Sequence, residues 1–227
     1  MPTLRLPRAF GSYLTQVSLL LISVLLALAV DRCNQNRKDA DRWQEYRTLI
    51  AQELERELRS TRMNLTDNAN DVAGLEAALA MLPAENDEQR LRVANEIGLL
   101  VARGVFRTFP PLTYELMVAN NDSHLIEDIE LRQRLSAYAS FRQDYIQADL
   151  ARYDALTLEL IDRVSPYLDL LCLRRSGGED PSCIIDTARM NAALRSDITK
   201  LYRHGTLRAF HLEKGATILD NLLTDFQ

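Results

Sequence analysis

The sequence predicts an all-α fold in which one N-terminal transmembrane helix continues into a stalk and an antiparallel bundle of about four main helices. Glycine and proline are scarce, 8 and 7 among 227 residues, and Leu, Ala, Arg and Glu are abundant, which favours helix. Residues 9–30 carry no charge. Beyond them, apolar residues recur every three or four positions, the spacing of one helix face.

Composition limits the choice of function. The hydrophobic share of 47% is enough for a packed core. The net charge of -5 argues against a nucleic-acid partner, because duplex recognition needs a concentrated basic face. We expect an N-terminal flank over residues 1–12, an anchor over 13–30, a stalk over 31–66 and a bundle domain over 67–227.

The uncharged run of 22 residues is the predicted membrane anchor. At 1.5 Å per residue it spans a hydrocarbon core of roughly 30 Å. A cleaved signal peptide, with Arg5 and Arg8 before the apolar run and a cut after Ala29, is the alternative. The run exceeds a usual signal core, and helix-compatible sequence continues past residue 30 without Pro or Gly, which favours the anchor. Lipid attachment at Cys33 is not indicated, because residues 30–32 are not small.

The basic residues flanking the anchor do not settle its orientation, because acidic residues offset those on the C-terminal side. Cys172 and Cys183 bracket a polar loop between two helical stretches. A disulfide between them would place the C-terminal side in an oxidising compartment. The alternative is two unrelated thiols near a loop.

The stalk begins the helical series. Its apolar stripe consists of Trp43, Tyr46, Ile50, Leu54 and Leu58. The charged residues between them, including the pair Glu53 and Glu57, are expected on a solvated face.

The stalk is expected to run to about Thr66, with a break and a new N-cap among Asn68, Asn70 and Asp71. A short helix over 72–82 should end at Pro83. The next helix starts at a cap of Asn86 or Asp87 and closes at Gly104.

Later segments follow the same pattern. Thr113 is expected to cap a short helix over 113–119. A long helix starts near Glu127 and ends or kinks at Pro166. Its predicted stripe is Leu131, Leu135, Tyr138, Phe141, Tyr145, Tyr153, Leu156, Leu160 and Val164. A last helix over 186–202 meets a potential interruption at Gly205 before a final stretch to Leu223.

Three short motifs resemble a family of uncharacterised bacterial single-pass membrane proteins. In that family the anchor ends in an Asp/Asn-x-Trp-Asn-x-x-Arg-Lys-like signature, and a helical domain carries Phe-Pro, Thr-Tyr-x-x-Leu and Leu-x-x-x-Leu-x-x-Tyr stretches. The matching membrane-junction residues are Asp31, Asn34, Arg37 and Lys38. The other matching residues are Phe109, Pro110, Thr113, Tyr114, Leu116, Leu131, Leu135 and Tyr138.

Cys33 stands where that family has Trp, so an interfacial anchor residue is lost at this position. The resemblance implies membrane anchorage and a helical domain, and it implies no activity, cofactor or catalytic residue. Together with the cysteine pair it leads us to expect a bacterial inner-membrane protein whose bulk is periplasmic. The motif residues after the junction are expected to serve packing.

No catalytic, cofactor or metal site is predicted. The sequence lacks the zinc, nucleotide and hydrolase motifs, and His204 and His211 have no companion ligand pattern. Carboxylate pairs such as Asp149 and Asp154 are expected on solvated faces.

The first functional hypothesis is therefore a membrane-anchored scaffold or accessory protein, with the bilayer and an unidentified protein as partners and self-association through the stalk as a secondary idea. The alternative is a sensor or ligand-binding bundle with a pocket lined by Arg107, Tyr114, His124 and Tyr138. A secreted protein with a cleaved signal is third.

Overall fold

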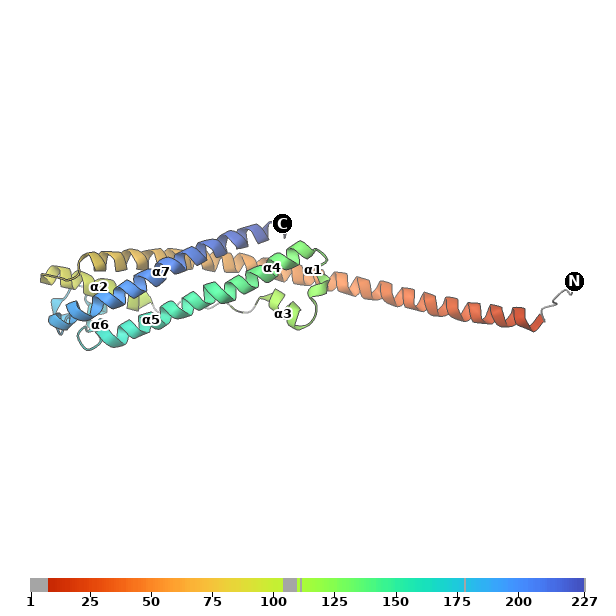
Figure 1. Ribbon diagram of the computed structural model, residues 1–227, viewed down its shortest axis with the longest axis horizontal. Coiled ribbons are helices and arrows are strands. Elements are labelled where there is room, and N and C mark those ends of the chain that lie inside the picture. Colours follow the sequence, from red (N-terminus) through yellow and green to blue (C-terminus); the bar gives the residue numbers. More distant parts are fainter. Residues whose placement is uncertain (1–7, 104–109, 111, 178, 227) are drawn as a thin grey trace.

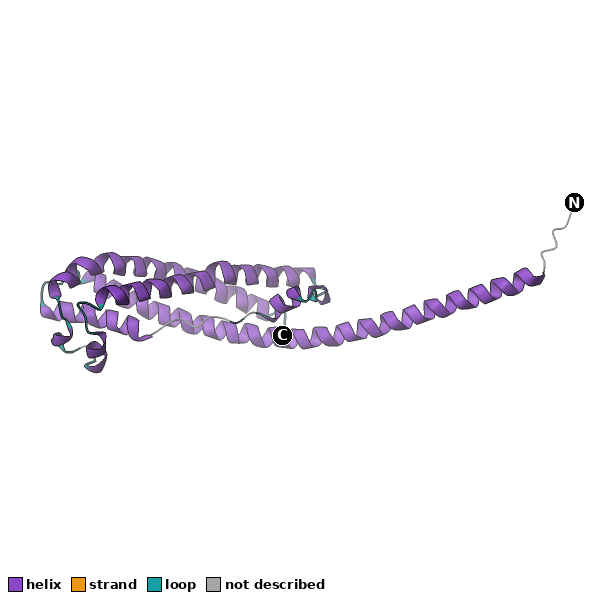
Figure 2. Ribbon diagram, turned by 90° about the horizontal axis from the view of Figure 1, so that it is seen from below, coloured by secondary structure: helices purple, strands orange, loops and turns teal. Residues whose placement is uncertain are grey.

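The computed structural model describes residues 8–103, 110, 112–177 and 179–226. Within those ranges it contains helices and no β-strand, only an isolated bridge between Leu168 and Ile184, so the all-α prediction is confirmed (Figure 2). The helices are α1 (Arg8–Ala80), α2 (Asp87–Arg103), α3 (Thr113–Ala119), η1 (Ser123–Leu125), α4 (Ile129–Phe141), η2 (Arg142–Gln147), α5 (Ala148–Val164), α6 (Leu170–Arg175), η3 (Pro181–Cys183) and α7 (Thr187–Leu223).

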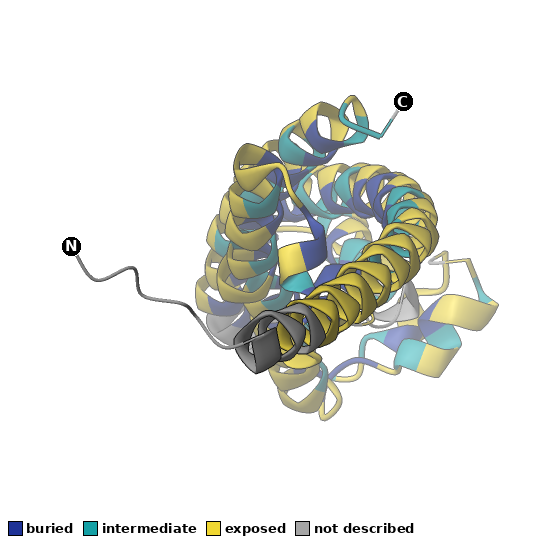
Figure 3. Cartoon of the chain, turned by 90° about the vertical axis from the view of Figure 1, so that its right-hand side faces the viewer, coloured by how far each residue is buried: buried dark blue, intermediate teal, exposed yellow. Residues whose placement is uncertain are grey.

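Helix α1 has 73 residues, about 110 Å at the usual rise, and its first part projects alone from the other helices (Figure 1). Residues 17–38 are all exposed, and Ile50 is the first buried residue among those whose burial is described in α1 (Figure 3). The exposed part includes a stretch long and apolar enough to cross a membrane, as the anchor prediction requires. From Trp43 onward, α1 packs with the later helices in what we call the helical body.

The predicted break in α1 near Asn68 is wrong, because the helix continues to Ala80. The Asn68 side-chain amide forms hydrogen bonds to another helix, α7, and does not cap a helix end. Its Nδ2 donates to the Gly205 carbonyl at 2.9 Å, and its Oδ1 accepts from Arg208 Nε at 2.7 Å. The helix ends shortly before Pro83, as predicted.

The potential interruption at Gly205 is also absent, and α7 runs through it as a single helix of 37 residues. A Cβ at Gly205 would lie only 2.8 Å from Val72 Cγ2 and 3.3 Å from Tyr153. The missing side chain therefore lets α7 approach α1 and α5 closely. The polar contacts Asn68–Gly205 and Arg62–Asp220 show that α1 and α7 run antiparallel.

Residues 129–164 form one continuous helical segment with a π-type turn, η2, between α4 and α5. The extra residue in that turn shifts the buried face. The predicted stripe is right for Leu131, Leu135 and Tyr138 but wrong for Tyr145, which is 47% exposed. Arg142 and Ile146 take the interior positions instead. The segment ends at Val164, before Pro166, as predicted.

Two apolar clusters fill the helical body. The one nearer the projecting part of α1 joins Ile50, Leu54 and Leu58 to residues of α3, α4 and α7. The other joins the far half of α1 to α2, α5, α6 and α7. The stalk stripe therefore packs against the chain's own helices. At the far end, a disulfide joins Cys172 of α6 to Cys183 of η3.

Thr113 is the first residue of α3 and does not cap it, contrary to the prediction. Leu112 takes the cap position, and Glu115 accepts a hydrogen bond from the Leu112 N–H at 2.9 Å. Asn86 does cap α2, since its Oδ1 accepts from Gln89 N at 2.9 Å. The predicted closure at Gly104 lies outside the described residues.

Candidate functional site

A row of polar residues runs along the inner face of α1. It consists of Glu57, Thr61, Asn64, Asn68 and Asp71, spaced alternately four and three residues apart, and we call it the polar seam. Because this spacing keeps residues on one face, the seam continues the apolar stripe with polar side chains. Thr61 and Asn68 are fully buried, and Glu57 is 6% exposed. Two buried arginines, Arg142 and Arg208, meet the seam from other helices.

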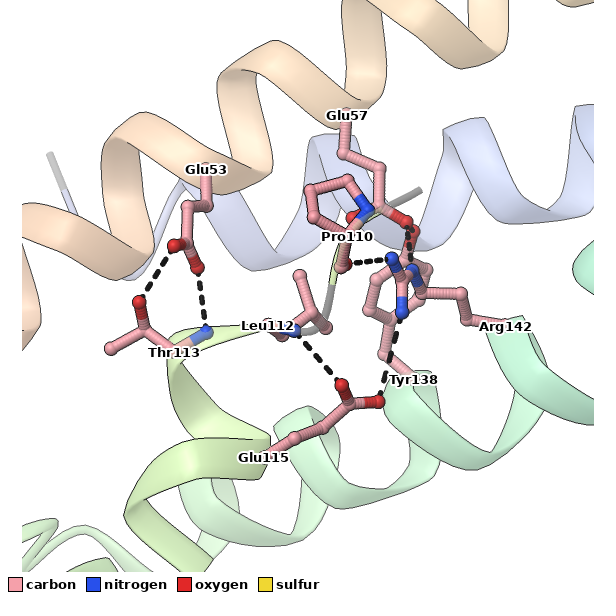
Figure 4. Close-up of polar contacts among 8 residues, drawn as sticks. All are labelled: Glu53, Glu57, Pro110, Leu112, Thr113, Glu115, Tyr138 and Arg142. Atoms are coloured by element: carbon pink, nitrogen blue, oxygen red, sulfur yellow. Dashed lines mark hydrogen bonds and ion pairs between the residues drawn. The ribbon is translucent and has the colours of Figure 1, made fainter. Parts of the chain in front are cut away.

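Glu57 is the centre of the first meeting point (Figure 4). Its Oε1 accepts a hydrogen bond from Tyr138 Oη at 2.6 Å and another from Arg142 Nε at 2.7 Å. Arg142 also donates to the Pro110 carbonyl, and its guanidinium lies 3.7 Å from a Glu115 oxygen. Arg142 is 2% exposed and Tyr138 is fully buried. The four side chains therefore tie α1, α3, α4 and η2 together in the interior.

The same carboxylate-rich region holds the segment before α3. Thr113 donates from both its backbone N–H and its Oγ1 to Glu53, each at 2.7 Å (Figure 4). With the Glu115 contact to Leu112 and the Arg142 contact to Pro110, this segment is fixed at three successive described positions. The carboxylates of Glu53 and Glu57 are therefore tertiary contacts. Their predicted place on a solvated face is wrong, most plainly for Glu57.

Burial sets the electrostatics of this cluster. Desolvation raises the pKa of Glu57, while the hydrogen bond from Tyr138 and the charge of Arg142 act in the opposite direction. Burial also raises the pKa of Tyr138 far above its usual value, and the adjacent Glu57 carboxylate adds to that rise. Tyr138 therefore stays protonated and acts as a hydrogen-bond donor.

The second meeting point surrounds Arg208, which is 1% exposed. Its Nε donates to Asn68 Oδ1, and its Nη2 lies 3.5 Å from Asp71 Oδ2. The guanidinium also stacks over the Tyr153 ring, 3.8 Å from the centroid. Asn68 binds the Gly205 carbonyl as well. This cluster joins α1, α5 and α7, just as the first joins α1, α3, α4 and η2.

These clusters are organised to align helices. Each buried charge has a counter-charge and hydrogen-bond partners within the protein, the condition under which interior charges are tolerated. Of the two described cavities, the one of about 710 Å³ is lined by other residues, and the one of about 280 Å³ includes Asp71 of the second cluster in its lining. Glu57, Tyr138 and Arg142 thus form a buried hydrogen-bonded cluster, and none of them lines a described cavity.

The residues of the sequence motifs take several different places. Asp31, Asn34, Arg37 and Lys38 lie on the exposed, projecting part of α1. Pro110, Thr113 and Tyr138 meet in the Glu57 region. Tyr114, Leu131 and Leu135 are buried, whereas Leu116 is 54% exposed. Phe109 lies outside the described residues.

The pocket that the sensor hypothesis requires does not come together in the described residues. Tyr114 and Tyr138 are buried, and Tyr114 donates to the Arg132 carbonyl at 3.3 Å. His124 lines the 710 Å³ cavity, whose lining includes neither tyrosine, and Arg107 is not among the described residues. His211 pairs with Asp149 between α7 and α5, so the expected solvated place of that carboxylate is also wrong.

Sequence reasoning missed Arg142 and Arg208. The sequence signal that could have indicated them is a polar residue that falls, by helical spacing, at an interior position of an apolar stripe. Glu57, Thr61, Asn64 and Asn68 keep helical spacing with Leu54 and Leu75, and Arg142 follows Tyr138 by four residues.

Comparisons with protein-family models, curated proteins and solved structures found no match to this chain.

Proposed function

We propose that this protein is a single-pass membrane scaffold that presents a rigid antiparallel bundle of four main helices to a protein partner on the outer side of a bacterial inner membrane. The observation that carries the proposal is the continuity of α1 from its exposed apolar stretch to the core of the helical body. A helix without a break transmits the position of the anchor directly to the body. The resemblance to single-pass bacterial proteins is part of the same proposal.

The closed interior supports a scaffold over a ligand-binding bundle. Interhelical space that a sensor would use for a ligand is filled by the Glu57–Arg142 and Asn68–Arg208 contacts. Binding between the helices would have to separate these partners and leave buried charges unpaired, at a cost of several kcal/mol. A partner is more easily accommodated on the outer faces.

The cysteine pair supports the proposed orientation. Cys172 and Cys183 are bonded at the end of the helical body farthest from the apolar part of α1. Disulfides persist in oxidising compartments and are rare in the cytosol. The proposal therefore places the helical body in the periplasm and the first residues of the chain in the cytoplasm.

The first experimental arm is thiol labelling in intact cells with a membrane-impermeant maleimide, in a Cys33→Ser background. We expect labelling of Cys172 and Cys183 only after reductant is added. Labelling that requires permeabilised cells would overturn the orientation.

The second arm places a photo-crosslinking amino acid at exposed Leu116 or Phe210, with buried Leu212 as the matched control. We expect a discrete protein adduct from at least one exposed position and none from position 212. A chain that crosslinks to nothing from exposed positions on all faces would overturn the scaffold function.

A further inference from the structure

The larger described cavity is a groove in the corner between the projecting part of α1 and the near end of the helical body. One wall is a single face of α1, formed by Asn36, Asp39, Ala40 and Trp43. The other wall is the segment His124–Asp128, which runs from the end of η1 to the N-cap of α4. We call it the corner groove. Its volume of about 710 Å³ suits several side chains rather than one small ion.

The groove combines an apolar surface with unneutralised carboxylates. Trp43 and Ala40 supply the accessible apolar part, over the buried Leu125 and Ile126, and Asp39, Glu127 and Asp128 supply the negative charge. Arg42, on the same helix, pairs with Asp122, which also accepts a hydrogen bond from Tyr46 at 2.8 Å. His124 Nδ1 lies within hydrogen-bonding distance of the Asn121 carbonyl oxygen, at 2.8 Å. Asp39 Oδ1 accepts a hydrogen bond from Gln35 at 3.1 Å, and Asp128 Oδ1 accepts from the backbone N–H groups of Glu130 and Leu131 as the N-cap of α4. No ion pair among the described residues neutralises the three carboxylates of the groove, so their charge can attract a positive partner.

We propose that the corner groove docks a basic segment, rich in Arg or Lys, of a partner protein in the same membrane. Long cationic side chains match both halves of the groove. Their methylene stems can cover Ala40 and Trp43, and their charged ends can reach the carboxylates. A guanidinium or ammonium can also lie over the Trp43 ring.

The height of the groove supports a membrane-bound partner, on the premise of the proposed anchor. Along α1, Asn36 lies about 9 Å beyond Val30 and Trp43 about 20 Å beyond it, at 1.5 Å per residue. The headgroup layer extends only about 5–8 Å beyond the hydrocarbon core. The groove thus opens just above the headgroups, where the first residues after a partner's transmembrane helix would lie. Anionic headgroups would be repelled by the carboxylates.

The chain contains a single tryptophan, and it lines the groove, so its fluorescence reports occupancy directly. The experiment uses the full chain in nanodiscs of phosphatidylcholine. The probe is a short amidated peptide of alternating Arg and Leu, and the control peptide has citrulline, the uncharged isostere, in place of Arg. We expect a saturable change in Trp43 emission with the Arg peptide, weakened by salt, and none with the citrulline peptide.

The variant D39N/E127Q should weaken binding by about tenfold or more, because two of the three groove carboxylates lose their charge. The matched control E55Q/E159Q neutralises two exposed acids away from the groove and should bind like the wild type. Circular dichroism checks that both variants keep their helical content. Equal affinity for D39N/E127Q and wild type, or binding of the citrulline peptide, would overturn the assignment.

Other occupants give distinct results, and each overturns the proposal. A Trp43 change that grows with protein concentration alone indicates a second copy of the chain. A change on transfer to phosphatidylglycerol discs indicates lipid. If the peptide fails to bind while the photo-crosslinked adducts persist, the groove assignment fails and the scaffold function stands. If the labelling experiment fails, the proposed orientation fails, and the peptide experiment still tests the groove.

Discussion

Arg142 Nε lies 2.7 Å from Glu57 Oε1, and this contact joins two residues 85 positions apart in the interior of the helical body. The arginine is 2% exposed and the glutamate 6%. A buried ion pair adds little net stability, but either charge left alone is strongly unfavourable. The contact therefore specifies how α1 meets η2 more than it strengthens the fold.

Removing one partner of this pair should be costly. We expect E57Q and R142M each to lower the free energy of unfolding by about 3–5 kcal/mol, measured by urea denaturation, because the remaining group is buried without its partner. The double variant should lose clearly less than the sum of the two. The control R62M breaks an exposed pair with Asp220, 59% and 50% exposed, and should cost under about 1 kcal/mol. Strict additivity of E57Q and R142M would contradict the coupling.

Tyr138 predicts a loss of stability at alkaline pH. Its pKa is raised in the folded chain, so above pH about 10 the folded chain holds a proton that the unfolded chain releases. Stability should therefore fall as pH rises, by up to about 1.4 kcal/mol per pH unit for this group. Thermal unfolding from about pH 8 to about pH 11 measures the slope. Y138F should reduce it, and Y145F, at an exposed position, should not.

Gly205 should not tolerate a side chain. G205A places a Cβ 2.8 Å from Val72 Cγ2 and 3.3 Å from Tyr153, so we expect a loss of about 1–3 kcal/mol from overpacking. The matched control is G98A within α2, where the nearest neighbour, Leu173 Cβ, is 3.7 Å from the new atom. That variant should be neutral or stabilising by up to about 1 kcal/mol through helix propensity. Chemical denaturation compares the two, and similar losses would refute the close approach.

Loss of the disulfide should weaken the far end of the helical body. C172S/C183S removes a bond that closes a loop with a sequence separation of 11, and we expect a loss of about 3 kcal/mol. Hydrogen exchange should rise first in α6 and η3, while the segment around Tyr138 keeps its protection. Uniform exchange over the whole chain would show instead that the bond stabilises the fold globally.

The all-helical fold could be predicted because it depends on local features of the sequence. Scarce Gly and Pro and stripes of helical spacing indicated an all-α chain, and Pro83 and Pro166 marked helix ends correctly. The seam was not predictable in the same way. Asn68 carries the residue type of a cap, and only the approach of Gly205 and Arg208 from α7 gives its amide a different use.

The register shift at η2 has the same origin. Up to Tyr138 the stripe follows simple spacing, and Phe141 and Tyr145 look like its continuation. The interior instead accepts Arg142, because Glu57 and Pro110 supply partners from segments more than thirty residues away. A single-helix pattern contains no information about such partners, so Arg142 resembled an ordinary surface arginine.

With α1 anchored in a membrane as proposed, its unbroken course fixes the rotational orientation of the helical body around the membrane normal. A helix turns 100° with each residue, so one residue inserted between Asp31 and Arg42 would swing every outer face by that angle and raise it only 1.5 Å. Seven inserted residues would lift it by about 10 Å and nearly restore the original bearing. The direction in which this protein faces its neighbours is thus encoded in the number of residues that follow Val30.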